Sequence, residues 1–176
     1  MRKFAIVAML AIVLAAGTAL AQTNVTVEPE TFIFGFMNVS NLPADGGAFQ
    51  FGQPWGTADL VSSFAGPEVT LSPNTIGDPT EYWYQCLEGN PGPECGEPGA
   101  PGNKIMEAIL YAQFTGDLAG QTVVFSGNVI SNSFTEHTVH AFIRDFASDF
   151  QSVVEEVIPL TAPGYFTLSL DTINDP

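Results

Sequence analysis

The fold class of this chain follows from the segment Ala162–Asp171, whose sequence is APGYFTLSLD. A Pro-Gly turn precedes a strictly alternating run, in which Phe166, Leu168 and Leu170 are separated by residues that are mostly polar. Successive side chains of a strand point to opposite sides of a sheet, so this alternation predicts a strand with one buried face. One buried face and one wet face are typical of antiparallel sheets.

The same alternation recurs along most of the chain. Candidate strands cover residues 32–37, 48–51, 59–64, 68–72, 123–129 and 139–146, with turns rich in Gly, Pro, Asn and Asp between them. Many short strands separated by such turns predict an all-β, antiparallel β-sandwich of jelly-roll type. Residues 105–114 also fit a helix, but we predict a strand there. In residues 150–160 helical spacing and alternation compete, and both alternatives stay open.

The N-terminus has the order of a secretory signal peptide. Arg2 and Lys3 precede an apolar run from Phe4 to Ala16, and Ala19–Ala21 has the small-x-small pattern of a cleavage site. The run is too short for a membrane-spanning helix. We therefore expect cleavage after residue 21 and no membrane insertion of the product. Residues 22–176 would form a single secreted, extracellular or periplasmic domain.

The charge of the mature chain is strongly negative. After removal of the leader only Lys104 and Arg144 remain against 19 acidic side chains, which makes a formal charge of −17. Such a field repels polyphosphates and anionic lipids, so we expect neither nucleic acid nor anionic lipid as a partner. The acidity favours calcium as a bound ion, or it reflects a salty medium that screens surface carboxylates.

Two cysteines, Cys86 and Cys95, are expected to form a disulfide in an oxidising compartment. A loop this short would be stabilised by about 2.5–3 kcal/mol in the chain-entropy model. A metal site is the alternative, but no histidine lies near enough in the sequence to complete it.

Aromatic side chains are the best candidates for ligand binding. Flat rings cover the C–H faces of sugars, while nearby polar groups bind the hydroxyls. The candidates are Trp55, Tyr82, Trp83 and Tyr84. Core packing is the alternative role for each of them. Arg144 is a further candidate, because it is one of only two cations left after cleavage. Its guanidinium can donate to sugar hydroxyls or pair with an acid.

Asp145 and Asp149 bracket a loop at the end of a predicted strand and could donate oxygens to calcium, with Glu155 or Glu156 as helpers. Their spacing is not that of an EF-hand loop, and solvated loop acids are the alternative interpretation. His137 and His140 would point to opposite faces of a strand, so they do not predict a zinc site.

No motif indicates catalysis, and we expect no catalytic residues. The chain has no GxSxG elbow, phosphate-binding glycine loop or dinucleotide fingerprint. Glycosidases need two carboxylates at set distances, and nothing singles out a pair among 19 acids. A small hydrolase is therefore a weaker hypothesis for the function than the two non-catalytic ones given at the end of this subsection.

Three segments resemble a known family. They are Leu118–Gly127 (LAGQTVVFSG), His140–Phe146 (HAFIRDF) and Ile158–Ser169 (IPLTAPGYFTLS), with DGGAFQ at residues 45–50 upstream. Their order is similar to carbohydrate-binding modules of families four and nine, which have a galactose-binding-like jelly roll. The resemblance covers roughly residues 45–170.

The chain departs from the family pattern at two places. Gln50 stands where the family has a glutamate, which puts the family's structural calcium in doubt. The family also has further closing strands and an Asp-Asp pair, whereas this sequence ends at Pro176. We expect either a variant fold or a truncated product that lacks the last strands.

We therefore expect a secreted, non-catalytic module that binds a polysaccharide or glycan or associates with a surface. The alternative is a structural or adhesive extracellular protein that self-associates through an exposed strand edge.

Overall fold

The computed structural model describes residues 22–25, 27–73, 102–114, 118–135 and 137–175. These residues form strands and two 3-10 helices, Pro29–Thr31 and Pro43–Asp45. The strands are β1 (Gln22–Asn24), β2 (Phe34–Asn41), β3 (Phe49–Pro54), β4 (Ser62–Ala65), β5 (Glu68–Leu71), β6 (Lys104–Tyr111), β7 (Thr122–Val129), β8 (His140–Phe146), β9 (Val153–Pro159) and β10 (Gly164–Asp171). The structure confirms the predicted all-β, antiparallel class and is consistent with a β-sandwich. The jelly-roll order of strands stays a prediction.

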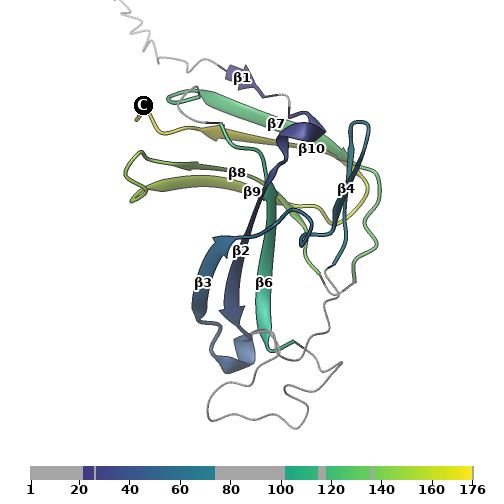
Figure 1. The fold of residues 1–176 in the computed structure, drawn as a ribbon. Coiled ribbons are helices and arrows are strands. Elements are labelled where there is room, and N and C mark those ends of the chain that lie inside the picture. The colour runs from purple at the N-terminus through teal and green to yellow at the C-terminus, as the bar shows by residue number, and fades with distance from the viewer. Residues whose placement is uncertain (1–21, 26, 74–101, 115–117, 136, 176) are drawn as a thin grey trace, which may run out of the picture. The chain divides into compact units, whose positions relative to one another are not determined.

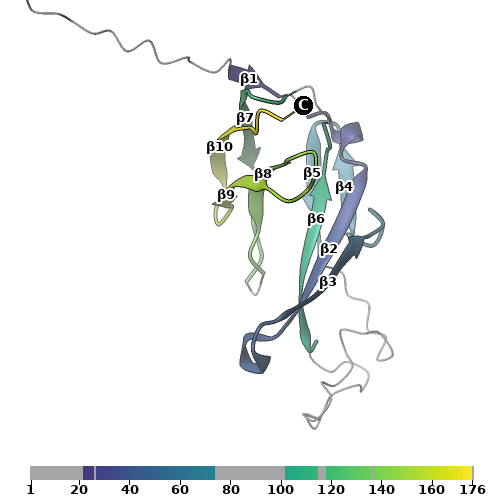
Figure 2. The same ribbon diagram turned by 90° about the vertical axis from the view of Figure 1, so that its left-hand side faces the viewer.

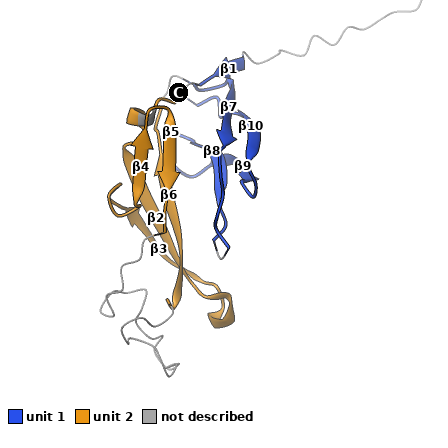
Figure 3. Ribbon diagram, turned by 90° about the vertical axis from the view of Figure 1, so that its right-hand side faces the viewer, with its two compact units in different colours: residues 1–25, 116–176 blue, residues 26–115 orange. Residues whose placement is uncertain are grey.

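The chain divides into two compact units, coloured separately in Figure 3. Unit 1 comprises residues 1–25 and 116–176, and unit 2 comprises residues 26–115. The prediction that residues 22–176 form one domain stays a prediction.

Unit 2 is built on a three-stranded antiparallel sheet in which β2 lies between β3 and β6 (Figure 1). Met37 and Val39 lie on one face of β2 and are 2% and 0% exposed. The chain after β3 closes over this face at Gly35, where any side chain would collide with the Trp55 carbonyl oxygen and with Leu60. The Trp55 amide donates to the Gly35 carbonyl oxygen over 2.9 Å. β4 and β5 form a separate hairpin.

Unit 1 contains a three-stranded sheet and a hairpin (Figure 2). In the sheet, β7 lies between β1, which is parallel to it, and β10, which is antiparallel. Phe166 of β10 lies opposite Gly127 and makes an edge-to-face contact with Phe125, with ring centroids 5.6 Å apart. Val123 and Leu168 are buried in this unit. β8 and β9 form the antiparallel hairpin.

The structure decides between the two alternatives left open for residues 150–160. Phe150 has a φ of +59°, which a right-handed helix does not allow, and β9 begins at Val153. The strand predicted within residues 105–114 is confirmed as β6.

Candidate functional site

One face of the β8–β9 hairpin combines apolar side chains with a single ion pair. Residues directly opposite each other in an antiparallel pair share a face. The hairpin register places Phe142 opposite Val157, Arg144 opposite Glu155, and Phe146 opposite Val153. We call these six residues the hairpin face. Phe146, Val153 and Val157 are 44–51% exposed, so this face has an apolar surface at both ends.

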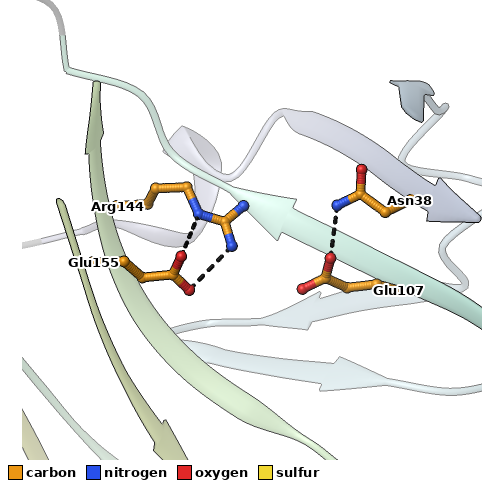
Figure 4. Close-up of polar contacts among 4 residues, drawn as sticks. All are labelled: Asn38, Glu107, Arg144 and Glu155. Carbon is orange, nitrogen blue, oxygen red and sulfur yellow. Dashed lines mark hydrogen bonds and ion pairs between the residues drawn. The ribbon is translucent and has the colours of Figure 1, made fainter. Parts of the chain in front are cut away.

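Arg144 and Glu155 form the polar centre of the hairpin face (Figure 4). The guanidinium donates twice to the carboxylate, from Nε to Oε2 over 2.9 Å and from Nη2 to Oε1 over 3.0 Å. The Arg144 Cζ also lies 5.0 Å from the centroid of the Phe142 ring, within the range of a cation–π contact. The two side chains remain 24% and 32% exposed, and pairs of this kind stabilise a fold by only about 0.2–1 kcal/mol. The main consequence of the pair is therefore a fixed orientation of its donors and acceptors.

The loop between β8 and β9 presents a third aromatic ring. Phe150 is 77% exposed, and its ring centroid lies 6.0 Å from that of Phe146. Its φ of +59° is in the left-handed region, where a side chain costs roughly 1–2 kcal/mol. The loop is held in shape by hydrogen bonds from the Phe150 amide to the Ala147 carbonyl oxygen (2.8 Å) and from the Ala147 amide to the Ser152 carbonyl oxygen (2.9 Å). An exposed phenylalanine in a strained position is difficult to explain by packing and suggests a binding role.

The two predicted metal ligands each accept a hydrogen bond from a backbone amide. Asp149 Oδ1 accepts from the Gln151 amide over 2.8 Å, and Asp145 Oδ2 accepts from the Ile173 amide over 2.7 Å. Ser148 adds two hydrogen bonds to Asp175, which follows β10. Within the described ranges, no three His, Cys, Asp or Glu side chains gather as a metal-binding group. Calcium binding by Asp145 and Asp149 stays a prediction.

Trp55 and Arg144 belong to different compact units. Trp55 belongs to unit 2, where its backbone lies against Gly35 and its side chain is half-buried. Tyr82, Trp83 and Tyr84 lie outside the described residues, and so do Cys86 and Cys95. Their predicted roles in ligand binding and in a disulfide stay predictions.

Sequence reasoning identified Arg144 but missed the aromatic rings around it. Alternation in the predicted strand over residues 139–146 puts Phe142 and Phe146 on the same face as Arg144, which was the available signal. Phe150 lies in the polar segment Ser148–Ser152, and an isolated phenylalanine between turn residues is a second signal for an exposed ring.

No protein-family model matches the chain, and comparisons with curated proteins and with solved structures give no match. The likeness to carbohydrate-binding modules therefore stays a resemblance in sequence. None of the helices in the part of the chain that the structure describes has the length and apolar character needed to cross a bilayer.

Proposed function

We propose that this protein binds a neutral glycan without cleaving it, through the hairpin face and Phe150. The observation that carries the proposal is Phe150, a ring that is 77% exposed and held in a left-handed conformation beside Phe146. Two adjacent rings supply a surface for the C–H face of a sugar. Arg144 and Glu155 lie in the strands beside them and offer a donor and an acceptor for hydroxyl groups.

The charge of the chain supports a neutral ligand. The formal charge of −17 on residues 22–176 repels uronic-acid and sulfated polymers at long range. The guanidinium of Arg144 is also already neutralised by a bidentate carboxylate. Hydroxyl groups can add to this pair without displacing either partner, whereas an anionic ligand would compete with Glu155.

The arrangement favours binding over hydrolysis. Glycosidases of the usual kind require two carboxylates that flank the scissile bond. Within strands β8 and β9, Glu155 is the only carboxylate on the hairpin face, because Asp145 and Glu156 alternate to the other side. Both oxygens of the Glu155 carboxylate accept hydrogen bonds from Arg144.

The wider proposal includes the features that the sequence predicts. We propose a secreted protein, released by cleavage after residue 21, whose strands follow a galactose-binding-like jelly roll. The Cys86–Cys95 disulfide and a calcium ion at Asp145 and Asp149 belong to the same proposal. The leader, the alternating strands and the acidic loop support it.

A retention assay on insoluble cellulose, chitin, xylan, mannan and β-1,3-glucan tests the binding site. We expect at least one polymer to retain the protein, and Phe150→Ala to weaken retention about 5- to 10-fold, since a lost aromatic contact costs roughly 1–1.5 kcal/mol. Glu155→Ala should weaken it as well. Two matched controls should retain full binding: Glu156→Ala, on the opposite hairpin face, and Tyr165→Ala, a ring on β10 that is 74% exposed.

Two outcomes would contradict the proposal. Full retention of both Phe150→Ala and Glu155→Ala would remove the hairpin face as the site. If Trp83→Ala alone abolished retention, binding would belong to the segment Tyr82–Tyr84 instead.

The second candidate function is assembly through a strand edge, and β6 favours it. Among the described strands, β6 is hydrogen-bonded to β2 alone and runs for eight residues. Its Ile105 side chain is 48% exposed. A long edge strand of this kind can pair with another chain. Sedimentation at increasing protein concentration in high salt would reveal such assembly, and Ile105→Lys should abolish it.

A further inference from the structure

The three-stranded sheet of unit 2 carries a row of polar groups across the face that does not hold Met37 and Val39. The register places Asn38 of β2 between Gly52 of β3 and Glu107 of β6. Asn38 Nδ2 donates to Glu107 Oε2 over 2.6 Å (Figure 4). This row and its neighbours on the same side form a surface that we call the sheet face.

Gly52 leaves the space that the polar row occupies. A Cβ at Gly52 would lie 2.6 Å from Asn38 Oδ1 and 2.9 Å from Cε1 of Phe36. The amide of Asn38 and the ring of Phe36 therefore lie over the backbone of β3, where any larger residue would displace them. The row thus spans all three strands at one register position.

Apolar side chains flank the polar row along the strands. Toward one end, the rings of Phe34 and Tyr111 stack with centroids 5.4 Å apart and an interplanar angle of 26°. Toward the other end, Phe49 and Ile105 are 63% and 48% exposed. The register places both opposite Ser40, on the same side of the sheet as Asn38. Between the polar row and the stacked rings, the register places Phe36 and Ile109 on the same side, and Ile109 is only 6% exposed. The exposed apolar surface of the sheet face therefore lies toward its two ends.

Two oxygen atoms on this face are hydrogen-bond acceptors without a donor among the described residues. Asn38 Oδ1 and Glu107 Oε1 accept no hydrogen bond from the described residues, and Glu107 is exposed. Sugar hydroxyls donate hydrogen bonds, and the C–H faces of a sugar cover aromatic rings. A second protein surface would instead bury the Glu107 carboxylate, which is costly without a paired cation.

We propose that the sheet face of unit 2 is a second binding site for a neutral glycan, made of other residues than the hairpin face. Asn38 and Glu107 would accept hydrogen bonds from hydroxyls, and Phe34 with Tyr111 would contact the ring of an adjacent sugar. Two sites on one chain would raise the apparent affinity for a polymer above that for a short oligosaccharide, provided that one polymer reaches both. The inference shares its ligand class with the proposed function but rests on different residues.

Nuclear magnetic resonance separates the two sites without any mutation. The ¹⁵N-labelled protein is titrated with cellohexaose, xylohexaose, mannohexaose and laminarihexaose. We expect the amide signals of Asn38, Gly52 and Glu107 to shift with one of these sugars, alongside those of residues 147–152. In Glu107→Ala, we expect affinity at the sheet face to fall about 5- to 10-fold, while affinity at the loop stays unchanged.

Each outcome supports or overturns one of the two proposals. Shifts confined to residues 147–152 would overturn the sheet-face site and leave the proposed function standing. Shifts confined to the sheet face would overturn the hairpin site and support this inference. If none of the four sugars shifts either set of signals, both assignments fail. Glu68→Ala, an exposed acid on β5, serves as the matched control for Glu107→Ala.

Discussion

Phe150 offers the sharpest test of the candidate site, because its backbone conformation and its ring have separable effects. Phe150→Ala and Phe150→Gly both remove the ring and its contact with Phe146. The two variants differ by one Cβ at a residue whose φ is +59°. Comparing them therefore isolates the cost of a side chain in the left-handed conformation, free of any change in ring contacts.

The expected difference follows from two opposing contributions. A Cβ in the left-handed region costs roughly 1–2 kcal/mol in the folded state. Glycine makes the unfolded chain more flexible, which offsets about 0.4–1 kcal/mol of that gain. We expect the glycine variant to exceed the alanine variant by about 0.5–1 kcal/mol in the free energy of unfolding. For a chain of this size, that corresponds to about 1–4 °C in Tm.

Urea unfolding followed by tryptophan fluorescence and scanning calorimetry measure this difference, provided that the m-values of the two variants agree. Both variants should lose binding in the retention assay, whichever is more stable. If alanine were as stable as glycine, or more so, Phe150 would not have the left-handed conformation. If stability followed the expected order but binding persisted, the strain would have no connection with ligand recognition.

Three further predictions concern stability. Gly127→Ala places a Cβ 2.6 Å from the Phe166 ring and should lower the free energy of unfolding by about 1–2 kcal/mol, measured by urea unfolding. In a double-mutant cycle, the same glycine substitution in a Phe166→Leu background should lose most of this cost. Val39→Ala, at a residue 0% exposed, should lower the free energy of unfolding by about 2–3 kcal/mol, whereas Val157→Ala, 44% exposed, should cost under about 1 kcal/mol; equal costs would contradict the assigned core. Burial lowers the pKa of the Lys104 ammonium below its usual 10.5, against an opposing attraction from a nearby carboxylate, so the folded state releases this proton at lower pH than the unfolded chain does. The difference in free energy of unfolding between the unmodified chain and Lys104→Met should therefore increase as pH rises from the lowered pKa toward 10.5. A decrease of this difference over the same pH range would refute the lowered pKa of Lys104.

The strands could be predicted from the sequence because the alternation of apolar and polar residues is a local property of the chain. The run Phe166–Leu170 and the run at 123–129 were both assigned correctly, and each became a strand of the unit 1 sheet. Residues 150–160 resisted prediction because apolar residues there satisfy both periods. The turn at Phe150, which depends on hydrogen bonds between Ala147 and Ser152, excludes the helix.

Only some residues of the candidate sites could be predicted from the sequence. Arg144 was singled out because cations are so scarce in this chain, and scarcity is visible in composition. Its partner Glu155 was proposed instead as a helper for calcium. Nothing in the sequence distinguishes Glu155 from Glu156, although the two side chains project from opposite faces of the hairpin.

The acidic charge, the signal-like leader and the alternating strands can all be read from the chain, because they depend on composition and on spacing between near neighbours. Pairing across strands cannot be read in this way. Arg144 meets Glu155 because a six-residue loop sets the hairpin register, and a shift by one residue would turn Glu155 to the other face. Asn38 lies over Gly52 because β2 and β3 pair in one register on this side of an irregularity at Val39 and Ser40. Register is a property of the folded sheet, and it is what brings the polar groups of both proposed sites together.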